Sequence, residues 1–150
     1  PSGTLTRAEF LTMLMRAADI QPESGEGKDA FADVSAKHWA YAYVYRAREM
    51  GILTPDEYPE GFGPDIPITR LEMCVMAVRT LGLEDEAVEN AGVELGFDDD
   101  DDIPLTYRGY VKIMVDWGVI AGYPDNTFRP ERNATRREAA VIIYRIAEED

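Results

Sequence analysis

Apolar residues recur every three or four positions in three stretches of this chain, which is the spacing of one face of an α-helix. Each stretch opens with the pattern Thr-Arg-x-Glu, beginning at Thr6, Thr69 and Thr135. In such a capping box the threonine hydroxyl accepts a hydrogen bond from the backbone N–H three residues later, and the glutamate accepts one from the threonine N–H. The pattern therefore predicts helices that begin near Arg7, Arg70 and Arg136.

The apolar positions also predict which face of each helix is buried. The expected faces are Phe10, Leu11, Leu14, Met15 and Ala18 in the first helix, Leu71, Val75, Val78 and Leu81 in the second, and Val141, Ile142, Tyr144 and Ile146 in the third. Gly82 is expected to end the second helix. Cys74 lies within that helix, and we expect it to be a buried small hydrophobe.

Two further helices are predicted ahead of the second and third capping boxes. They span roughly residues 37–50 and 104–117, and each is followed by a glycine, Gly51 or Gly118, as helix ends often are. Residues 84–96 are expected to hold a short helix or turn, and residues 66–68 a brief extended piece. The predicted fold class is therefore all-α.

The chain is internally repetitive. Phe31 precedes Thr69 by 38 residues, and Phe97 precedes Thr135 by 38 residues. The repeated unit has an aromatic and acidic entry, a helix, a Gly-rich turn, a proline and a capped helix. We interpret residues 1–150 as one module, with 1–30 the second part of a first repeat, 31–96 a second repeat and 97–150 a third. The first copy begins at the proline, so we expect the chain to be a fragment of a three-repeat module.

Composition narrows the possible functions. The formal net charge of -14 argues against general binding of nucleic acid, which needs clustered Lys and Arg. No apolar run approaches the roughly 18 residues of a membrane span, and no signal-peptide pattern is visible. A single cysteine allows neither an intrachain disulfide nor a cysteine zinc site.

The segments "FADVSAKHWA", "EMGIL" and "GYPDNTFRP", combined with the three Thr-Arg-x-Glu helix starts, resemble the S-layer homology module. The resemblance implies a pseudo-threefold, mostly helical bundle of helix–loop–capped helix repeats. It also implies non-covalent attachment of a secreted protein to the bacterial cell envelope, and so an extracellular location at the cell wall or S-layer. The implied ligand is a secondary cell-wall polysaccharide or another peptidoglycan-linked glycan, often carrying pyruvate ketals.

The arginine after each capping threonine belongs, by this resemblance, to the binding grooves. Arg7, Arg70 and Arg136 are not required by the cap, and a cation near a helix N-terminus is mildly unfavourable. A guanidinium can bind a carboxylate such as a pyruvyl group in a bidentate manner. The alternative is that each arginine forms a salt bridge in this acidic chain. The threonines and glutamates of the boxes are interpreted as structural.

Further ligand contacts are expected at the turn "GYPDNTF", from Gly122, Asp125, Asn126 and Thr127. These are turn-forming residues first, but such a turn also exposes backbone N–H groups beside a helix start. The corresponding turn of the second copy is one residue longer between its glycine and phenylalanine. Trp39 could stack on a sugar or lie in the core.

Other chemistry is weakly supported. The run "DDDDD" is interpreted as a solvated acidic loop, with calcium binding by Asp98, Asp100 and Asp102 as the lesser alternative. His38 is expected at the surface of a helix start. No nucleophile–base pair, phosphate loop or cofactor motif emerges, so we expect no enzyme activity and no cofactor.

Two functions remain open from sequence. The first is a carbohydrate-binding anchor to the cell envelope. The second is a protein–protein assembly module, in which self-association covers the apolar surface left by the incomplete first repeat.

Overall fold

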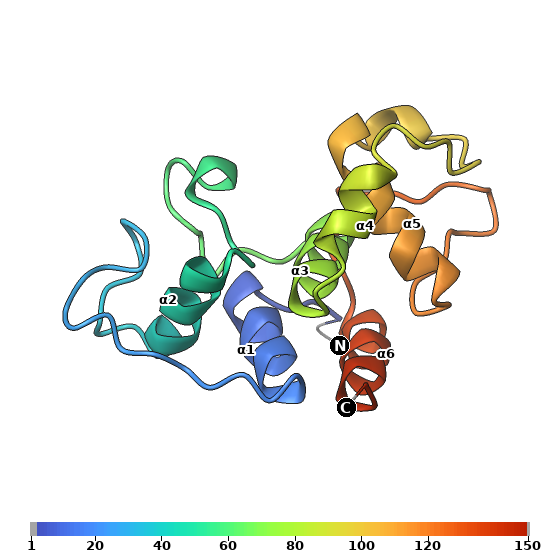
Figure 1. The fold of residues 1–150 in the computed structure, drawn as a ribbon. Helices are drawn as coiled ribbons and strands as arrows, with labels where there is room; N and C mark the ends of the chain where they lie inside the picture. The colour runs from blue at the N-terminus through green and yellow to red at the C-terminus, as the bar shows by residue number, and fades with distance from the viewer. Residues whose placement is uncertain (1–2, 150) are drawn as a thin grey trace.

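The computed structural model of this protein describes residues 3–149, and these residues are helical with short connecting loops (Figure 1). The α-helices are α1 (Arg7–Ala17), α2 (Tyr41–Met50), α3 (Arg70–Thr80), α4 (Glu84–Glu89), α5 (Arg108–Asp116) and α6 (Arg136–Ala147), and the 3₁₀ turns are η1 (Pro55–Glu57), η2 (Asp100–Asp102) and η3 (Leu105–Tyr107). Pairing between extended segments in the described residues is limited to isolated bridges. The all-α prediction is confirmed.

All three predicted capping boxes are present. The hydroxyls of Thr6, Thr69 and Thr135 accept the N–H of the glutamate three residues on, each at 3.1 Å. The glutamate side chains accept the threonine N–H at 2.9–3.0 Å. We call α1, α3 and α6 the capped helices, and α2 and α5, which precede α3 and α6 in their repeats, the front helices.

The front helices begin later than predicted. The expected start near residue 37 is wrong, because residues 35–40 form turns, in which His38 Nδ1 accepts the Ala40 N–H at 3.0 Å and α2 begins only at Tyr41. The predicted helix 104–117 is divided into η3 and α5. Both end as expected, at Gly51 and Gly118, whose φ values of 81° and 74° are left-handed.

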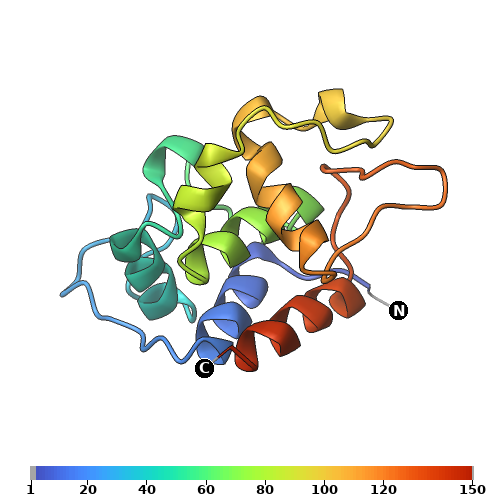
Figure 2. The same ribbon diagram turned by 45° about the vertical axis from the view of Figure 1, so that its right-hand side comes forward.

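The starts of the capped helices contact one another in cyclic order. Backbone N–H groups donate from Arg7 to Ile66, from Arg70 to Arg132 and from Arg136 to Gly3. Isolated bridges join Thr6 with Pro67, Thr69 with Asn133 and Thr4 with Thr135. This cyclic arrangement is consistent with the expected pseudo-threefold bundle. The packing of the helices is not threefold in the described residues, because α2 packs on α1 and α5 on α3, whereas α6 packs mainly on α1 (Figures 1 and 2). The pseudo-threefold bundle therefore stays a prediction.

The core surrounds α3. Its residues Met73 to Val78 are all at most 7% exposed, so this helix is buried on nearly every side. Cys74 is buried as predicted, and burial raises the pKa of its thiol to about 12. None of the helices in residues 3–149 has the length and hydropathy required to cross a membrane.

The predicted buried face of the third capped helix is half wrong. Ile142 and Ile146 are buried, but Val141 is 45% exposed and Tyr144 is 69% exposed. An apolar residue at helical spacing is buried only where a neighbouring element covers it, and α6 has fewer neighbours than α1 or α3.

Candidate functional site

Arg7 lies at one end of a cavity of about 150 Å³ between α3, the loop after α2, and η3. Its Nε donates to Glu72 Oε2 at 2.7 Å, and its Nη1 donates to the carbonyl oxygen of Phe62 at 2.9 Å. The guanidinium lies 5.1 Å from the ring centroid of Tyr58, whose hydroxyl also donates to Glu72, at 3.0 Å. The predicted site residue Arg7 therefore lines a cavity that has an aromatic wall and a carboxylate.

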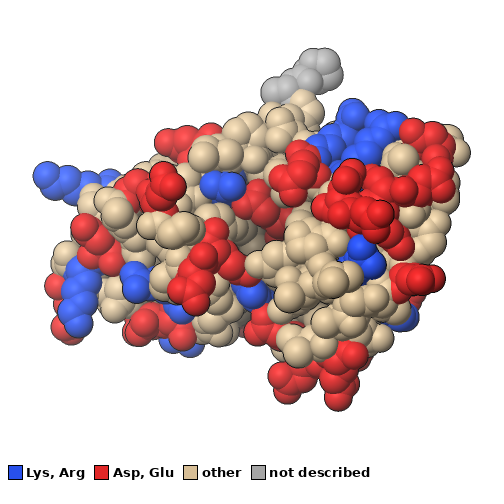
Figure 3. Space-filling view, turned by 90° about the horizontal axis from the view of Figure 1, so that it is seen from above, with Lys and Arg blue, Asp and Glu red and all other residues tan. Residues whose placement is uncertain are grey.

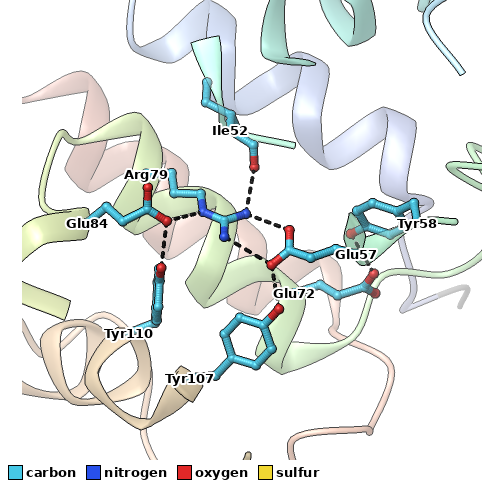
Figure 4. Close-up of polar contacts among 8 residues, drawn as sticks. All are labelled: Ile52, Glu57, Tyr58, Glu72, Arg79, Glu84, Tyr107 and Tyr110. Atoms are coloured by element: carbon cyan, nitrogen blue, oxygen red, sulfur yellow. Dashed lines mark hydrogen bonds and ion pairs between the residues drawn. The ribbon is translucent and has the colours of Figure 1, made fainter. Parts of the chain in front are cut away.

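Arg79 also lines this cavity, and Figure 4 shows its polar contacts. Its Nη1 and Nη2 donate to the two oxygens of Glu57 at 2.7 and 3.0 Å, and its Nε donates to Glu84. Tyr107 donates to Glu57, and Tyr110 donates to Glu84 at 2.6 Å. This cluster joins α3 and α4 to η1, η3 and α5.

The cluster shifts the pKa values of its members. Burial alone would raise the pKa of Glu57, but hydrogen bonds from Arg79 and Tyr107, with the charge of Arg79, hold it below its ordinary value. Burial and the hydrogen bond to Glu84 raise the pKa of Tyr110 to about 12. Glu57 is therefore ionised and Tyr110 protonated at neutral pH.

Arg70 occupies an equivalent place but is buried. Its guanidinium lies 4.8 Å from the Tyr123 ring centroid and 4.6 Å from that of Phe128. It donates to Glu138 and to the carbonyl oxygens of Phe128 and Ala121. With 2% of its side chain exposed, Arg70 does not reach the surface in this conformation.

Arg136 is the most accessible of the three. Its side chain is 52% exposed, and its guanidinium is 3.6 Å from Glu9. Each of the three arginines is thus paired with the capping-box glutamate of another capped helix: Arg7 with Glu72, Arg70 with Glu138 and Arg136 with Glu9. All three arginines therefore form the salt bridges that the alternative interpretation predicted. Their contact with a ligand stays a prediction.

The turn at residues 122–127 is held by hydrogen bonds within the turn and by bonds to Gly96 and Asp98. Asp125 accepts the N–H and hydroxyl of Thr127, and the bonds from Thr127 and Arg129 hold its pKa below the ordinary value. Asn126 adopts a φ of 63° and donates to Gly96 and Asp98. A Cβ on Gly122 would lie 2.4 Å from the Phe97 ring, so this position needs glycine. The turn-forming role is observed, and the ligand role remains a prediction.

The acidic run is more than a solvated loop. Asp99 accepts the N–H groups of Phe128 and Arg129, each at 2.8 Å, and Asp100 accepts those of Leu95, Gly96 and Phe97. The expectation of solvation is therefore wrong for these two residues. Asp98 pairs with Asn126, and Asp102 is exposed. In residues 3–149 no group of three His, Cys, Asp or Glu side chains is placed to hold a metal.

Trp39 is 62% exposed, which excludes the core alternative. Its ring lies 5.7 Å from that of His38, a half-buried residue rather than the surface residue expected. Trp39 is absent from the lining of the Arg7 cavity. Sugar stacking on this ring stays a prediction.

Sequence reasoning missed a second set of arginines, although a signal was available. Nine positions after the first arginine of each capped helix stands another: Arg16, Arg79 and Arg145. Each lies over an aromatic ring, that of Tyr43, Tyr110 or Trp117, at 5.3, 5.6 and 4.6 Å from the centroid. Aligning the three capped helices at their capping threonines would have shown this second arginine in each repeat.

On the face shown in Figure 3, charged side chains of both signs lie among uncharged ones, and the red acidic groups predominate over the blue basic ones. Two arginines of the third repeat lie over one ring, that of Tyr123. The guanidinium carbons of Arg129 and Arg132 lie 4.0 and 5.4 Å from the Tyr123 centroid, on the ring that also contacts Arg70.

Comparison with known proteins gives concordant matches. The chain is 37% identical over 149 residues to an amylopullulanase of Thermoanaerobacterium thermosulfurigenes, covering 99% of the chain but 8% of that protein. It is 29% identical over 152 residues to a cellulosome-anchoring protein of Acetivibrio thermocellus, covering 99% of the chain and 33% of that protein. It is 32% identical over 105 residues to a surface layer protein of Brevibacillus choshinensis, covering 68% of the chain and 9% of that protein.

The chain thus spans a small part of each of these relatives, of which one is named as a cellulosome-anchoring protein and one as a surface layer protein. The sequence profile of the S-layer homology domain matches residues 30–74 and residues 96–140. These two matches include both front helices and the starts of α3 and α6. The chain belongs to the S-layer homology domain family.

Proposed function

We propose that this chain anchors its parent protein to the bacterial cell wall by binding a secondary cell-wall polysaccharide that carries pyruvate ketals. Family membership and relatives named as a cellulosome-anchoring protein and a surface layer protein support anchoring. The identity of the glycan rests on the resemblance to the family and on the chemistry of the Arg7 cavity.

The observation that carries the proposal is the cavity that joins Arg7 and Arg79. A pyruvyl carboxylate can replace the Glu72 carboxylate at the Arg7 guanidinium, because Arg7 keeps 19% of its side chain exposed. Glu57 and Tyr107 then supply hydrogen-bond partners for sugar hydroxyls. The ring of Tyr58 supplies an apolar face for a sugar ring.

The proposed role needs binding without bond cleavage. Glu57 and Glu72, the carboxylates of this cavity, are each held by an arginine. The lowered pKa of Glu57 makes it a poor proton donor at neutral pH. We therefore propose that glycan cleavage by relatives such as the amylopullulanase belongs to other parts of those longer proteins.

The three arginines are proposed to differ in their roles. Arg7 contacts the ligand carboxylate, and exposed Arg136 is a second contact. Arg70 supports the loop beside it, since it is covered by Tyr123 and Phe128. Contacts from Trp39 and from the turn at residues 122–127 would extend the binding surface along the polysaccharide.

Co-sedimentation with purified cell-wall sacculi tests this function. The chain should sediment with intact sacculi and stay in solution with sacculi stripped of their polysaccharide. Arg7→Ala should weaken binding by about tenfold or more, as expected for loss of a charge-assisted bidentate contact. Arg16→Ala is the matched control, because Arg16 also lies on α1 and is not among the residues lining the cavity.

Binding that survives removal of the polysaccharide would refute the proposed ligand. Equal binding by the Arg7→Ala variant and the wild type would refute the proposed site. Circular dichroism of both variants shows whether a loss of binding reflects a loss of fold.

A further inference from the structure

The loops that follow α2 and α5 are equivalent in the repeat but differ in length. Gly51 precedes the tyrosine of its loop, Tyr58, by seven residues, whereas Gly118 precedes Tyr123 by five. The longer loop forms the 3₁₀ turn η1, and no helical turn is formed between the glycine and the tyrosine of the shorter loop, all of which the structure describes. Through η1 the longer loop adds Glu57 to the lining of the cavity described above.

The arginines beside these two loops differ in their hydrogen bonds. Arg70 donates through all three guanidinium nitrogens, and its Nη2 donates to the carbonyl oxygen of Ala121 in the shorter loop. Arg7 donates through Nε and Nη1, to Glu72 and to the carbonyl oxygen of Phe62, but its Nη2 has no acceptor among residues 3–149. The Nη2 of Arg7 is thus a donor available to a ligand carboxylate.

Arg79, the second arginine of this cavity, is already neutralised. Glu57 accepts from its Nη1 and Nη2 at 2.7 and 3.0 Å, and Glu84 accepts from its Nε at 2.5 Å. Two carboxylates on one guanidinium give this cluster a net negative charge. A ligand carboxylate is therefore attracted to Arg7 and not to Arg79.

Glu57 keeps one acceptor position for a ligand. An ionised carboxylate offers about four acceptor positions, and three donors occupy those of Glu57: Nη1 and Nη2 of Arg79 and the hydroxyl of Tyr107 (Figure 4). The Glu57 side chain is 21% exposed where it lines the cavity. The remaining position suits a hydroxyl donor, whereas the negative charge repels a second carboxylate.

We propose that Glu57 determines the specificity of the Arg7 cavity. The cavity takes a sugar unit whose one carboxylate is held by Arg7 and whose hydroxyl donates to Glu57, and it rejects a unit with a second carboxylate in place of that hydroxyl. Arg79 and Tyr107 act as positioning residues that hold the Glu57 carboxylate. This inference rests on the proposed binding of a pyruvylated glycan and adds which units of this class are selected.

Isothermal titration calorimetry with a matched pair of sugars tests the proposal. The first probe is the 3,4-pyruvate ketal of methyl galactoside. The second is the same ketal of the methyl glycoside of galacturonic acid, in which a carboxylate replaces the hydroxyl group at C6. The wild type should bind the first probe about tenfold more tightly or better. Glu57→Gln should reduce this preference by about tenfold, because it removes the repelling charge.

Asp56→Asn is the matched control, because Asp56 lies in the same turn, is exposed and is not among the residues lining the cavity. It should keep the wild-type preference. An unchanged preference in Glu57→Gln would overturn the role of Glu57 alone, as would an equal reduction in Asp56→Asn, which would indicate general charge repulsion. A wild type that binds neither ketal would refute the proposed ligand, and this inference with it.

Discussion

Arg7 and Arg70 occupy the same position of the same motif, yet one lines a cavity and the other is buried. Both lie over the tyrosine of a Tyr-Pro turn and donate to the carbonyl oxygen of a phenylalanine. The difference lies in the loop beside each arginine. Arg70 also lies over Phe128 and donates to Ala121, whereas Arg7 faces the cavity shared with Arg79 and Tyr107. A repeated motif thus sets the position of an arginine, and the loop and next repeat set its accessibility.

The largest loss of stability is expected when the buried arginine, Arg70, is replaced. Arg70→Ala should destabilise the protein by about 3–5 kcal/mol, because it leaves the partly buried Glu138 carboxylate and two carbonyl groups without their donor. Arg7→Ala should cost clearly less, because the Arg7 side chain is already 19% exposed and the Tyr58 hydroxyl still donates to Glu72. Urea unfolding at pH 7 gives both values. Equal losses would show that the two arginines are equally integrated into the core.

The loops can be tested through their anchoring aspartates. Asp33 accepts the N–H groups of Phe62 and Gly63 at 2.9 and 2.8 Å, as Asp99 does for Phe128 and Arg129. We expect either aspartate→Ala change to cost roughly 2 kcal/mol, the scale of hydrogen bonds to a charged group.

Hydrogen exchange should show that each of these substitutions loosens one loop only. Asp33→Ala should expose the amides of Phe62 and Gly63, and Asp99→Ala those of Phe128 and Arg129. Asp99→Ala should also expose Arg70 to solvent, so that its exposure becomes more like that of Arg7. A uniform increase in exchange across both loops would contradict this assignment.

The cavity beside Arg7 should respond to pH through Glu57. Its folded-state pKa lies below the ordinary value of 4.5, so its stabilising contribution is present above that pH and is lost as the pH falls through the folded-state value. Glu57→Gln should therefore destabilise the protein at pH 7, by at most about 1 kcal/mol for this partly exposed pair. The difference from wild type should shrink below about pH 4. A difference that is constant with pH would show that the carboxylate charge is not what matters.

The smallest effect is expected at Arg136. Its contact with Glu9 is long and largely exposed, so Arg136→Ala should change the free energy of unfolding by less than about 0.5 kcal/mol. Urea unfolding of Arg136→Ala and of Arg70→Ala compares the free energy of unfolding of the most exposed and the most buried of the three arginine positions. A loss above 1 kcal/mol would mean that Arg136 is integrated like Arg70.

The sequence alone predicted the helical class, the three helix starts and the glycine ends. These features depend on contacts within a few residues: a capping box closes over three positions, and a left-handed glycine acts on the turn before it. The family resemblance was likewise carried by local segments and was confirmed. The start of α2 was missed because the turns at residues 35–40, with His38 bonded to the backbone, took the place of the first predicted helical turn.

Only the tertiary structure decided which of three equivalent arginines is buried, which aspartates hold loops and which face of α6 is exposed. Asp33 and Asp99 bind backbone groups 29 and 30 residues away, and Arg70 pairs with Glu138, 68 residues away. Such partners share no local pattern in the sequence. Burial at Tyr144 likewise depends on whether another helix lies over it, because apolar spacing defines a face but does not supply the element that covers it.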